Sequence, residues 1–273
     1  MCADVSGKRQ PRRDRLRVMF EDLNGKVAVV TGGARGLGLE MADALAEMGC
    51  AVALLDLGEG VERSAADLHN RRDVPTLGLH ADVTDDAALE ESFRRIGADL
   101  GTPSVLVNAA GVTAWVEAED MAAADWRRVL DINLTGTFLT CQAFARTVFA
   151  SRGTGAIVNV SSMSAFVVNV PQRQAAYNVS KSGIDQLTRS LAVEWVDRGI
   201  RVNAIAPGYF LSDMTRQFID ANPEVGDGWR SRIPAGRLGE PADLRGLVVF
   251  LASDAARYVV GESVVIDGGY TLV

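Results

Sequence analysis

The chain has 273 residues, of which 48% are hydrophobic and 23% charged, and its formal net charge is −7. This size and composition predict one globular domain, and the acidic balance offers no basic face for a nucleic acid. His69 and His80 lie in no metal-ligand spacing, which argues against zinc enzymes and Ser-His-Asp enzymes and predicts no metal site. The widely spaced Cys2, Cys50 and Cys141 argue against a disulfide framework and favour a cytoplasmic location.

The first 22 residues are rich in basic side chains and poor in apolar ones, which predicts a disordered basic tail ahead of a domain spanning 23–273. A partner-binding or targeting arm is the alternative. No apolar run approaches the roughly 18 residues of a membrane span, and no hydrophobic signal region is present. We therefore expect neither membrane insertion nor export.

A β-branched run at residues 26–31, a glycine loop and a helical pattern to residue 48 follow in the order of a nucleotide-binding unit. The loop reads T-G-G-A-R-G-L-G, and its candidate cofactor contacts are Gly32, Arg35, Gly36, Leu37 and Gly38. Glycines let the backbone turn tightly and approach a pyrophosphate at the N-terminus of the helix. A tight turn without a ligand would also explain them.

Asp56 ends a second apolar strand at residues 50–56. A carboxylate there can accept both ribose hydroxyls and would repel a 2′-phosphate, which favours NAD over NADP. Arg35 favours NADP instead, because its guanidinium could reach a 2′-phosphate. A helix-capping role is a further alternative for Asp56.

Two more strands, at residues 76–83 and 104–111, end in candidate cofactor contacts: Asp82, Val83, Asn108, Ala109 and Gly111. Asp82 could bond the adenine amine, and the small residues after Asn108 would let a cofactor lie against the backbone. Amphipathic stretches at residues 61–68 and 87–100 make the β-α alternation regular. This alternation predicts an α/β fold with parallel strands and helices on both faces.

Residues 157–187 carry the candidate chemistry. A strand leads through a loop with Ser162 and Ser164 into a helix, on which Tyr177 and Lys181 share one face. The ammonium would lower the pKa of the phenol and suit it to proton transfer, although an ordinary helix pair would look the same. No other lysine follows Lys26, while arginine supplies most of the positive charge, and this favours a proton relay at Lys181.

Asn133 stands among apolar neighbours in a helical stretch at residues 122–150. It could be a hydrogen-bonded core amide, or an amide that bends the helix or anchors a relay water. Further along, residues 201–206 read as a sixth strand before Pro207 and Gly208, and residues 244–252 and 262–266 as a helix and a closing strand. Periodicity weakens over 209–237, which we interpret as a mobile substrate lid.

With its motifs TGGARGLG, ADV, NAAG, NVSS, YNVSK and APG in this order, the chain resembles the short-chain dehydrogenase/reductase family over residues 24–273. The resemblance implies a single Rossmann-like, doubly wound domain of seven parallel strands. It also implies a catalytic tetrad of Asn133, Ser162, Tyr177 and Lys181. Tyr177 would be the acid/base, Ser162 would hold the substrate oxygen, Lys181 would bind the nicotinamide ribose, and Asn133 would order a relay water.

The same resemblance implies cofactor contacts at Pro207, Gly208 and Ser212. Members of the family are commonly tetramers, so we expect a homotetramer built by pairing the helices around Asn133 and Tyr177. The small residues Ser180, Ser182 and Gly183 would allow close helix packing there.

Ser162 precedes Tyr177 by fifteen residues, a longer gap than most of the family has, and Ser164 at the usual spacing is the rival serine. This longer loop resembles that of the sugar-alcohol dehydrogenases of the family, of the galactitol and arabinitol type. It would bring Ser164, Asn169 and Gln172 to the substrate as hydrogen-bond partners for extra hydroxyls. Loop capping by Asn169 and Gln172 is the alternative.

The residues and the resemblance together predict an NAD-dependent enzyme that interconverts a small polyol and a ketose, with NADP as the alternative cofactor. A reductase of a β-ketoacyl thioester or another apolar ketone, possibly using NADPH, is a second hypothesis. A regulatory protein that senses NAD is a third.

Overall fold

The computed structural model describes residues 20–273, except for the side chains at 213, 214, 217 and 218. The predicted tail therefore lies almost entirely outside the described residues. Its last residues belong to the fold, because Asp22 accepts hydrogen bonds from Lys26 Nζ at 2.7 Å and from the backbone N–H of Asp254 at 3.0 Å. The domain thus begins slightly before the predicted boundary at residue 23.

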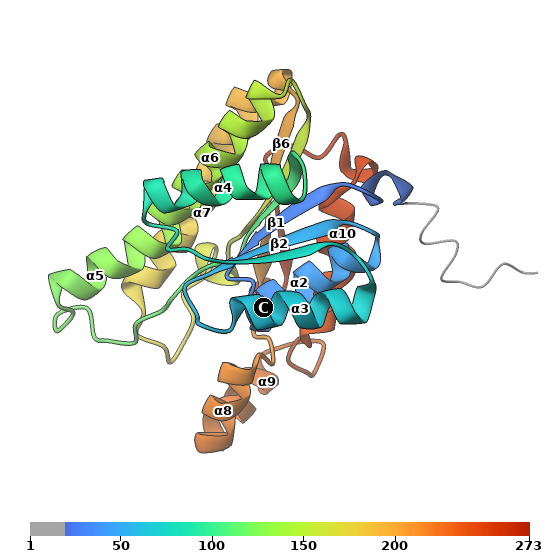
Figure 1. Cartoon of the computed structure of the whole chain (residues 1–273). Coiled ribbons are helices and arrows are strands. Elements are labelled where there is room, and N and C mark those ends of the chain that lie inside the picture. Colours follow the sequence, from blue (N-terminus) through green and yellow to red (C-terminus); the bar gives the residue numbers. More distant parts are fainter. Residues whose placement is uncertain (1–19) are drawn as a thin grey trace, which may run out of the picture.

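Seven parallel strands form one sheet in the order β3-β2-β1-β4-β5-β6-β7 (Figure 1). Most of these strands are runs of apolar, often β-branched residues that are buried on both faces, which is typical of a parallel sheet between two layers of helices. The predicted seven-stranded, doubly wound sheet is confirmed. The strands are β1 (Val27–Thr31), β2 (Ala51–Asp56), β3 (Thr76–His80), β4 (Pro103–Asn108), β5 (Gly155–Val160), β6 (Ile200–Pro207) and β7 (Ser263–Ile266).

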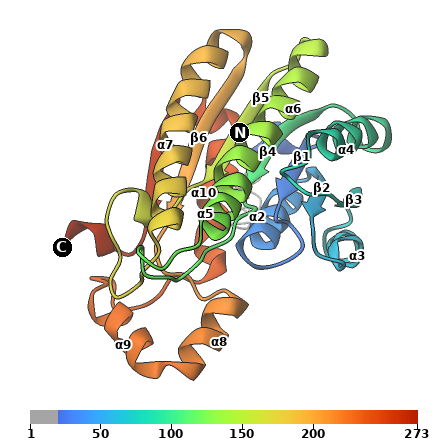
Figure 2. The same ribbon diagram turned by 90° about the vertical axis from the view of Figure 1, so that its left-hand side faces the viewer.

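Helices cover both faces of the sheet (Figures 1 and 2). One hydrophobic core lies between the sheet and α2, α3 and α10, and a second lies between the sheet and α4, α6 and α7. This arrangement leaves the carboxyl ends of the strands open for a site. The helices of these two layers are α2 (Gly36–Glu47), α3 (Val61–Arg72), α10 (Arg245–Ala252), α4 (Asp86–Asp99), α5 (Ala123–Leu130), α6 (Gly136–Ala150) and α7 (Ala175–Trp195).

The long helix predicted at residues 122–150 is interrupted. A π-helical segment, Asp131–Thr135, joins α5 to α6 and contains the fully buried Asn133. Helices of this kind widen by one residue, often at functional positions. Two small residues of α7 meet this segment within the same chain: Ser180 accepts a hydrogen bond from Asn133, and a side chain on Gly183 would collide with Leu134.

Two helices, α8 (Asp213–Ala221) and α9 (Pro223–Ser231), project from the carboxyl side of the sheet in the region predicted as a lid (Figure 2). Their inner residues Ile219 and Trp229 pack with Met163, Ile233 and Tyr270 in a small third core. The weak sequence periodicity therefore conceals two short amphipathic helices. We call residues 209–237 the lid region.

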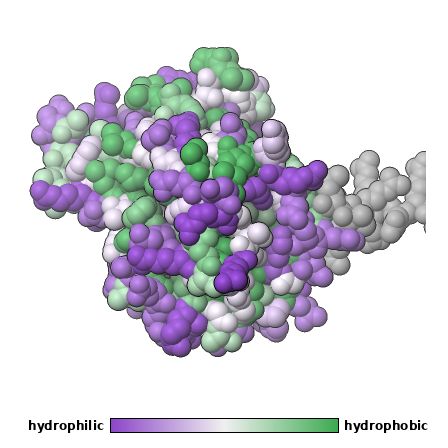
Figure 3. All heavy atoms as spheres, turned by 90° about the horizontal axis from the view of Figure 1, so that it is seen from above, coloured by the Kyte–Doolittle hydropathy of each residue, from purple (hydrophilic) through white to green (hydrophobic). Residues whose placement is uncertain are grey.

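On the face drawn in Figure 3, hydrophobic residues lie in patches among hydrophilic ones and form no continuous apolar surface. None of the helices formed by residues 20–273 is both long enough and apolar enough to span a bilayer.

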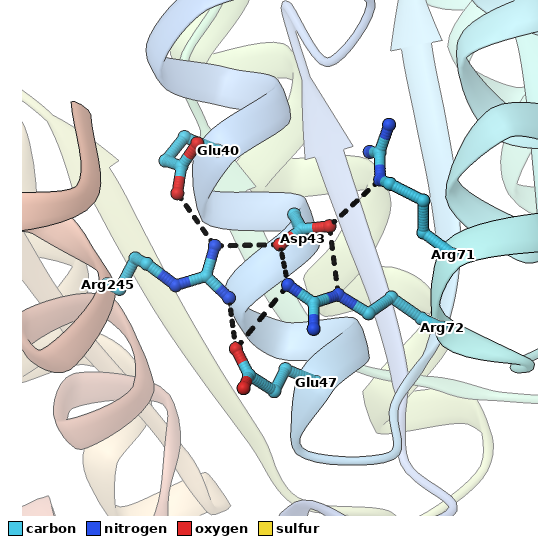
Figure 4. Close-up of polar contacts among 6 residues, drawn as sticks. All are labelled: Glu40, Asp43, Glu47, Arg71, Arg72 and Arg245. Atoms are coloured by element: carbon cyan, nitrogen blue, oxygen red, sulfur yellow. Dashed lines mark hydrogen bonds and ion pairs between the residues drawn. The ribbon is translucent and has the colours of Figure 1, made fainter.

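An ion-pair cluster fixes α2 against its neighbours (Figure 4). Arg245, at the start of α10, donates to Asp43 and Glu40 at 2.7 Å each, and Arg72 of α3 donates to Asp43 at 3.0 Å. Burial raises the pKa of Asp43, but the hydrogen bonds from Arg72 and Arg245 outweigh it and hold the pKa below its ordinary value. Glu47 and Arg71 complete the cluster.

Candidate active site

The topology gathers the predicted tetrad at the carboxyl end of β5. Ser162 follows β5, Tyr177 and Lys181 lie on α7, and Asn133 lies in the π-helical segment that packs on α7. The ammonium of Lys181 lies 5.5 Å from the centre of the Tyr177 ring and donates to the carbonyl oxygen of Val160 at 2.7 Å. Both α7 side chains therefore lie on the face that meets the sheet.

Asn133 makes three hydrogen bonds with its amide. It accepts from the backbone N–H of Val112 at 2.8 Å and donates to the carbonyl of Val112 and to the hydroxyl of Ser180, each at 2.9 Å. The amide thus ties the helix interruption to the loop after β4. Asn133 is thus a hydrogen-bonded core amide, one of the interpretations of its sequence position, and it also lies where the helix is distorted, as the second interpretation requires.

The pKa of Tyr177 differs from the sequence-based expectation. We expected Lys181 to lower it, but burial of the phenol raises the pKa, and a hydrogen bond with Ser162 opposes that rise without cancelling it. The same burial lowers the pKa of Lys181 to about 8, with Asp185 acting against the change. The expectation is wrong for the chain by itself, since burial has the largest influence on the pKa of each group.

Ser162 and Ser164 are hydrogen-bonded to each other, so the two rival serines form one unit. Ser162 Oγ donates to Ser164 Oγ at 3.1 Å, and it also accepts from the backbone N–H of Ser164 as the cap of a 3₁₀ turn. Both side chains are buried. Ser162 is the one that contacts Tyr177.

The substrate loop, residues 161–174, continues this polar chain. Ser164 donates to Asn169 Oδ1 at 3.0 Å, and Asn169 Nδ2 donates to the hydroxyl of Tyr209 at 3.3 Å. The side chain of Gln172 lies 2.8 Å from the same hydroxyl. The structure therefore joins Asn169 to Ser162 through side chains, and it joins both Asn169 and Gln172 to Tyr209.

The glycine loop between β1 and α2 leaves no room for side chains at two positions. A Cβ on Gly32 would lie 2.7 Å from the backbone nitrogen of Ala110, and a Cβ on Gly38 would lie 2.2 Å from the carbonyl oxygen of Gly32. At Gly36, by contrast, φ is +58°, and a Cβ there would have no atom within 4 Å. Arg35 makes no side-chain cap at the start of α2, so the first N–H groups of this helix are free for an anion. These features fit the pyrophosphate of a dinucleotide.

The two carboxylates expected around the adenosine follow β2 and β3, and Asp56 contacts the glycine loop. Asp56 accepts from the backbone N–H of Ala34 at 3.0 Å and from that of Gly58 at 2.9 Å, so it braces the glycine loop and caps no helix. Asp82 accepts from Thr84 through one carboxylate oxygen. Arg35 is exposed.

Two of the remaining predicted cofactor contacts lie at the end of β4 and in the loop after it. Asn108 is buried and donates to Asn159 and Cys141, so its side chain points into the protein. Gly111 lies against the tetrad, since a Cβ there would be 3.3 Å from Asn133 Oδ1 and 3.7 Å from Lys181 Nζ. Small residues are thus required where the loop after β4 passes the tetrad.

Three further predicted contacts, Pro207, Gly208 and Ser212, lie at the end of β6 or after it. Gly208 packs against Asp267, because a Cβ there would lie 2.6 Å from the Cβ of that residue, and it follows Pro207 at the strand end. Ser212 caps α8 by accepting from the backbone N–H of Thr215 at 3.2 Å. Leu37 of α2 and Ala109 after β4 pack against the first hydrophobic core, and Val83 after β3 is buried.

Known proteins are similar to this chain in sequence and architecture over almost its whole length. A family model described as "Enoyl-(Acyl carrier protein) reductase" matches residues 32–271. Galactitol 2-dehydrogenase (L-tagatose-forming) of Cereibacter sphaeroides is 41% identical over 257 residues, covering 94% of this chain and 98% of that protein. The crystal structure of a short-chain type dehydrogenase/reductase from Mycobacterium marinum superposes with a TM-score of 0.88 at 34% identity, covering 94% and 100% of the two chains. The chain belongs to the short-chain dehydrogenase/reductase family.

As a short-chain dehydrogenase/reductase, the protein is an oxidoreductase that uses NAD or NADP. A further relative, the NADP-dependent mannitol dehydrogenase of Hypocrea jecorina, is 40% identical over 265 residues, covering 96% of this chain and 97% of that protein. Among residues 20–273, no cluster of side chains could hold a metal ion.

Sequence reasoning missed several residues that complete the site. Gln174 is buried and lies within hydrogen-bond distance of Ser164 and Asn178. Tyr209 stacks on Trp229, with ring centres 4.3 Å apart, and meets Tyr270 edge-on at 5.4 Å. The one signal in the sequence is that Tyr209 directly follows Pro207-Gly208. Nothing in the local pattern places it beside the substrate loop.

Proposed function

We propose that this enzyme interconverts a polyol and a ketose, oxidising one secondary hydroxyl at a time. The observation that carries the proposal is the buried polar chain from Ser162 through Ser164 to Asn169. Buried hydroxyl and amide groups of this kind need partners, and a substrate with neighbouring hydroxyls supplies them. The names of the galactitol and mannitol dehydrogenases among its relatives support the same substrate class.

Each tetrad residue has a defined task in this reaction. When bound, NAD(P) supplies the nicotinamide ring that accepts or returns a hydride. Ser162 holds the substrate oxygen, and Tyr177 takes the hydroxyl proton in oxidation or returns it in reduction. Because burial raises the pKa of Tyr177, the chain by itself keeps the phenol protonated, ready to act as the acid toward a ketone. Lys181 places its ammonium near the ring of Tyr177, and the amide of Asn133 helps to hold α7 in position through its hydrogen bond to Ser180.

For the cofactor we propose NAD as the preferred form. Asp56 places a carboxylate at the end of β2, next to the glycine loop, where it would repel a 2′-phosphate. The exposed Arg35 and the name of the NADP-dependent mannitol relative support the other choice. Initial rates with saturating NAD and NADP separate the two, and a higher kcat/KM with NADP would contradict this assignment.

A second candidate function is reduction of a β-ketoacyl thioester or another apolar ketone. It is favoured by exposed apolar side chains on the substrate loop, where Phe166 is 46% and Val168 76% exposed. The enoyl-(acyl carrier protein) reductase description of the family model agrees with such a substrate. These side chains would line the path of an acyl chain.

A substrate panel run with both cofactors tests the proposal. It should contain sugar alcohols from four to six carbons, mono-alcohols of the same chain lengths, ketoses, and an acetoacetyl thioester. We expect NADH formation with at least one sugar alcohol and little turnover of the matching mono-alcohol. Efficient turnover of the thioester alone would replace the polyol proposal by the second candidate.

We also propose a homotetramer and a cytoplasmic location. Helices α5, α6 and α7 expose Trp126, Phe138 and Val179, which a second copy could cover by helix pairing. Ser182 donates to Ala165 of its own chain, so the small residues of α7 serve the fold whatever the oligomeric state. Light scattering after gel filtration should give about four times the 29.1 kDa of one chain. The buried free thiols of Cys50 and Cys141 support a reducing compartment.

A further inference from the structure

The hydrogen bonds of the substrate loop run in one direction. Ser162 donates to Ser164, Ser164 donates to Asn169 Oδ1, and Asn169 Nδ2 donates to the hydroxyl of Tyr209. Each of the first three side chains is less than a tenth exposed. The direction of the chain is set at its far end, because an amide can present either its oxygen or its nitrogen to Ser164.

The hydroxyl of Tyr209 lies at the far end of this chain of hydrogen bonds and determines its direction. Its hydroxyl is an acceptor for Asn169 Nδ2, and it finds its own acceptor in Gln172, whose Oε1, when turned toward it, also accepts from the indole N–H of Trp229 at 3.2 Å. The Tyr209 ring is stacked on Trp229 of α9. Burial raises the pKa of Tyr209 to about 12, so the hydroxyl keeps its proton near neutral pH.

We propose that Tyr209 is a positioning residue for substrate selection, which locks the amide of Asn169 so that Ser164 must accept a hydrogen bond from the substrate. With Asn169 Oδ1 facing Ser164, the hydrogen of Ser164 is committed to Asn169 and its lone pairs are left for a donor. Ser162 is that donor while no substrate is bound. Tyr209 reaches the substrate only through Asn169 and Ser164.

Substrate binding then exchanges one donor for another. When Ser162 turns its O–H to the substrate oxygen, Ser164 loses its donor, and the hydroxyl on the neighbouring substrate carbon can take that place. A mono-alcohol or simple ketone has no such hydroxyl, so it leaves a buried serine oxygen with only the distant amide of Gln174, at 3.4 Å. The enzyme would thereby select a hydroxyl adjacent to the reacting carbon. This inference rests on the proposed polyol function.

The test compares a vicinal diol with the mono-alcohol of equal chain length, each assayed as kcat/KM with saturating cofactor. The variant is Tyr209→Phe, which keeps the ring stacked on Trp229 and removes only the hydroxyl. We expect the preference for the diol to fall about tenfold, the value of one lost hydrogen bond to a buried group, while kcat/KM for the mono-alcohol stays within about threefold. In an Asn169→Leu background, Tyr209→Phe should have little further effect, because either substitution removes the oriented amide of residue 169 that faces Ser164.

A matched control is Tyr258→Phe, which deletes the hydroxyl of a side chain that is 99% exposed and should leave the preference unchanged. If Tyr209→Phe lowers both substrates equally, Tyr209 is merely structural and the inference is overturned, as it is if the variant keeps the wild-type preference. A wild-type enzyme with no preference for the diol would overturn both this inference and the polyol function.

Discussion

The proposed cofactor side and the proposed substrate side of the site are built in different ways. On the cofactor side, from β1 to the loop after β4, close approaches of backbone decide the shape, as at Gly32 and Gly38. On the substrate side, side chains from the substrate loop and the lid region meet through hydrogen bonds, as Asn169 and Tyr209 do across forty positions of sequence. The first arrangement leaves almost no freedom for substitution, whereas the second can be retuned one side chain at a time.

This difference suggests how one fold accommodates many substrates. NAD and NADP share the same pyrophosphate and differ by one phosphate group, so a backbone cradle can serve either of them. Alcohols differ in their hydroxyls, and a relay of hydroxyl and amide groups can be altered without disturbing the sheet. The two sides meet at Lys181, which lies within van der Waals reach of the space beside Gly111 and also faces Tyr177.

The largest effect is expected from Tyr177→Phe. Loss of the phenol removes the proton donor and acceptor, so kcat should fall by at least about a thousandfold. NADH should bind with nearly unchanged affinity, because the cofactor side is formed by other residues. Steady-state rates and quenching of tryptophan fluorescence by NADH measure the two quantities. Retained turnover would remove Tyr177 from its assigned role, and loss of NADH binding would show that the two sides are not separable.

Gly38→Ala, in contrast to Tyr177→Phe, should change NADH binding and stability. The new methyl group would collide with the carbonyl of Gly32, so the loop must shift, which we expect to weaken NADH binding about tenfold and to cost about 1–3 kcal/mol in unfolding free energy. Gly97→Ala is the matched control, because Gly97 also lies inside a helix, α4, but has nothing within 4 Å of its Cβ position. That variant should gain about 0.5–1 kcal/mol. Equal behaviour of the two variants in urea unfolding would refute the backbone argument.

These two sides also differ in how far sequence alone predicts them. The sheet, its helices and the glycine loop were predictable because hydrophobic period and glycine spacing are local signals. The tetrad could be named because its motif residues match a family pattern. Tyr209 escaped, since its partners Asn169 and Gln172 lie far away in the chain and only the fold brings them together. The rise in the pKa of Tyr177 escaped for a related reason, because burial is a property of the folded protein.

Arg245→Met tests whether the cofactor side depends on side chains after all. The substitution leaves Glu40, Asp43 and Glu47 together with less positive charge, and we expect a loss of about 2 kcal/mol in stability, a value that allows for partial solvent access. Arg94→Met is the control, because its ion pair with Glu91 is fully exposed and should contribute little. Urea unfolding measures both. If NADH affinity also falls, the cluster positions α2 as well as stabilising it, and the contrast between the two sides weakens.

The smallest effect concerns Lys181, at the boundary of the two sides. Burial lowers its pKa to about 8, whereas in the unfolded chain it titrates near 10.5. Between these values the unfolded chain holds a proton that the folded chain has lost, so Lys181 makes stability rise with pH across that window. Cys50 and Cys141 act in the opposite sense above about pH 9, because burial raises the pKa of each thiol to about 12.

The contribution of Lys181 is therefore isolated by subtracting the curve of Lys181→Met from that of the wild type, both without cofactor. The difference in unfolding free energy should grow by about 1–2 kcal/mol in favour of the wild type from pH 8 to pH 10. Lys26→Met, which removes a partly exposed lysine paired with Asp22, should give no such growth. A flat difference for Lys181→Met would mean that the ammonium is stabilised in the folded protein. The positive charge beside Tyr177 would then persist at alkaline pH, and the chain alone could favour the phenolate.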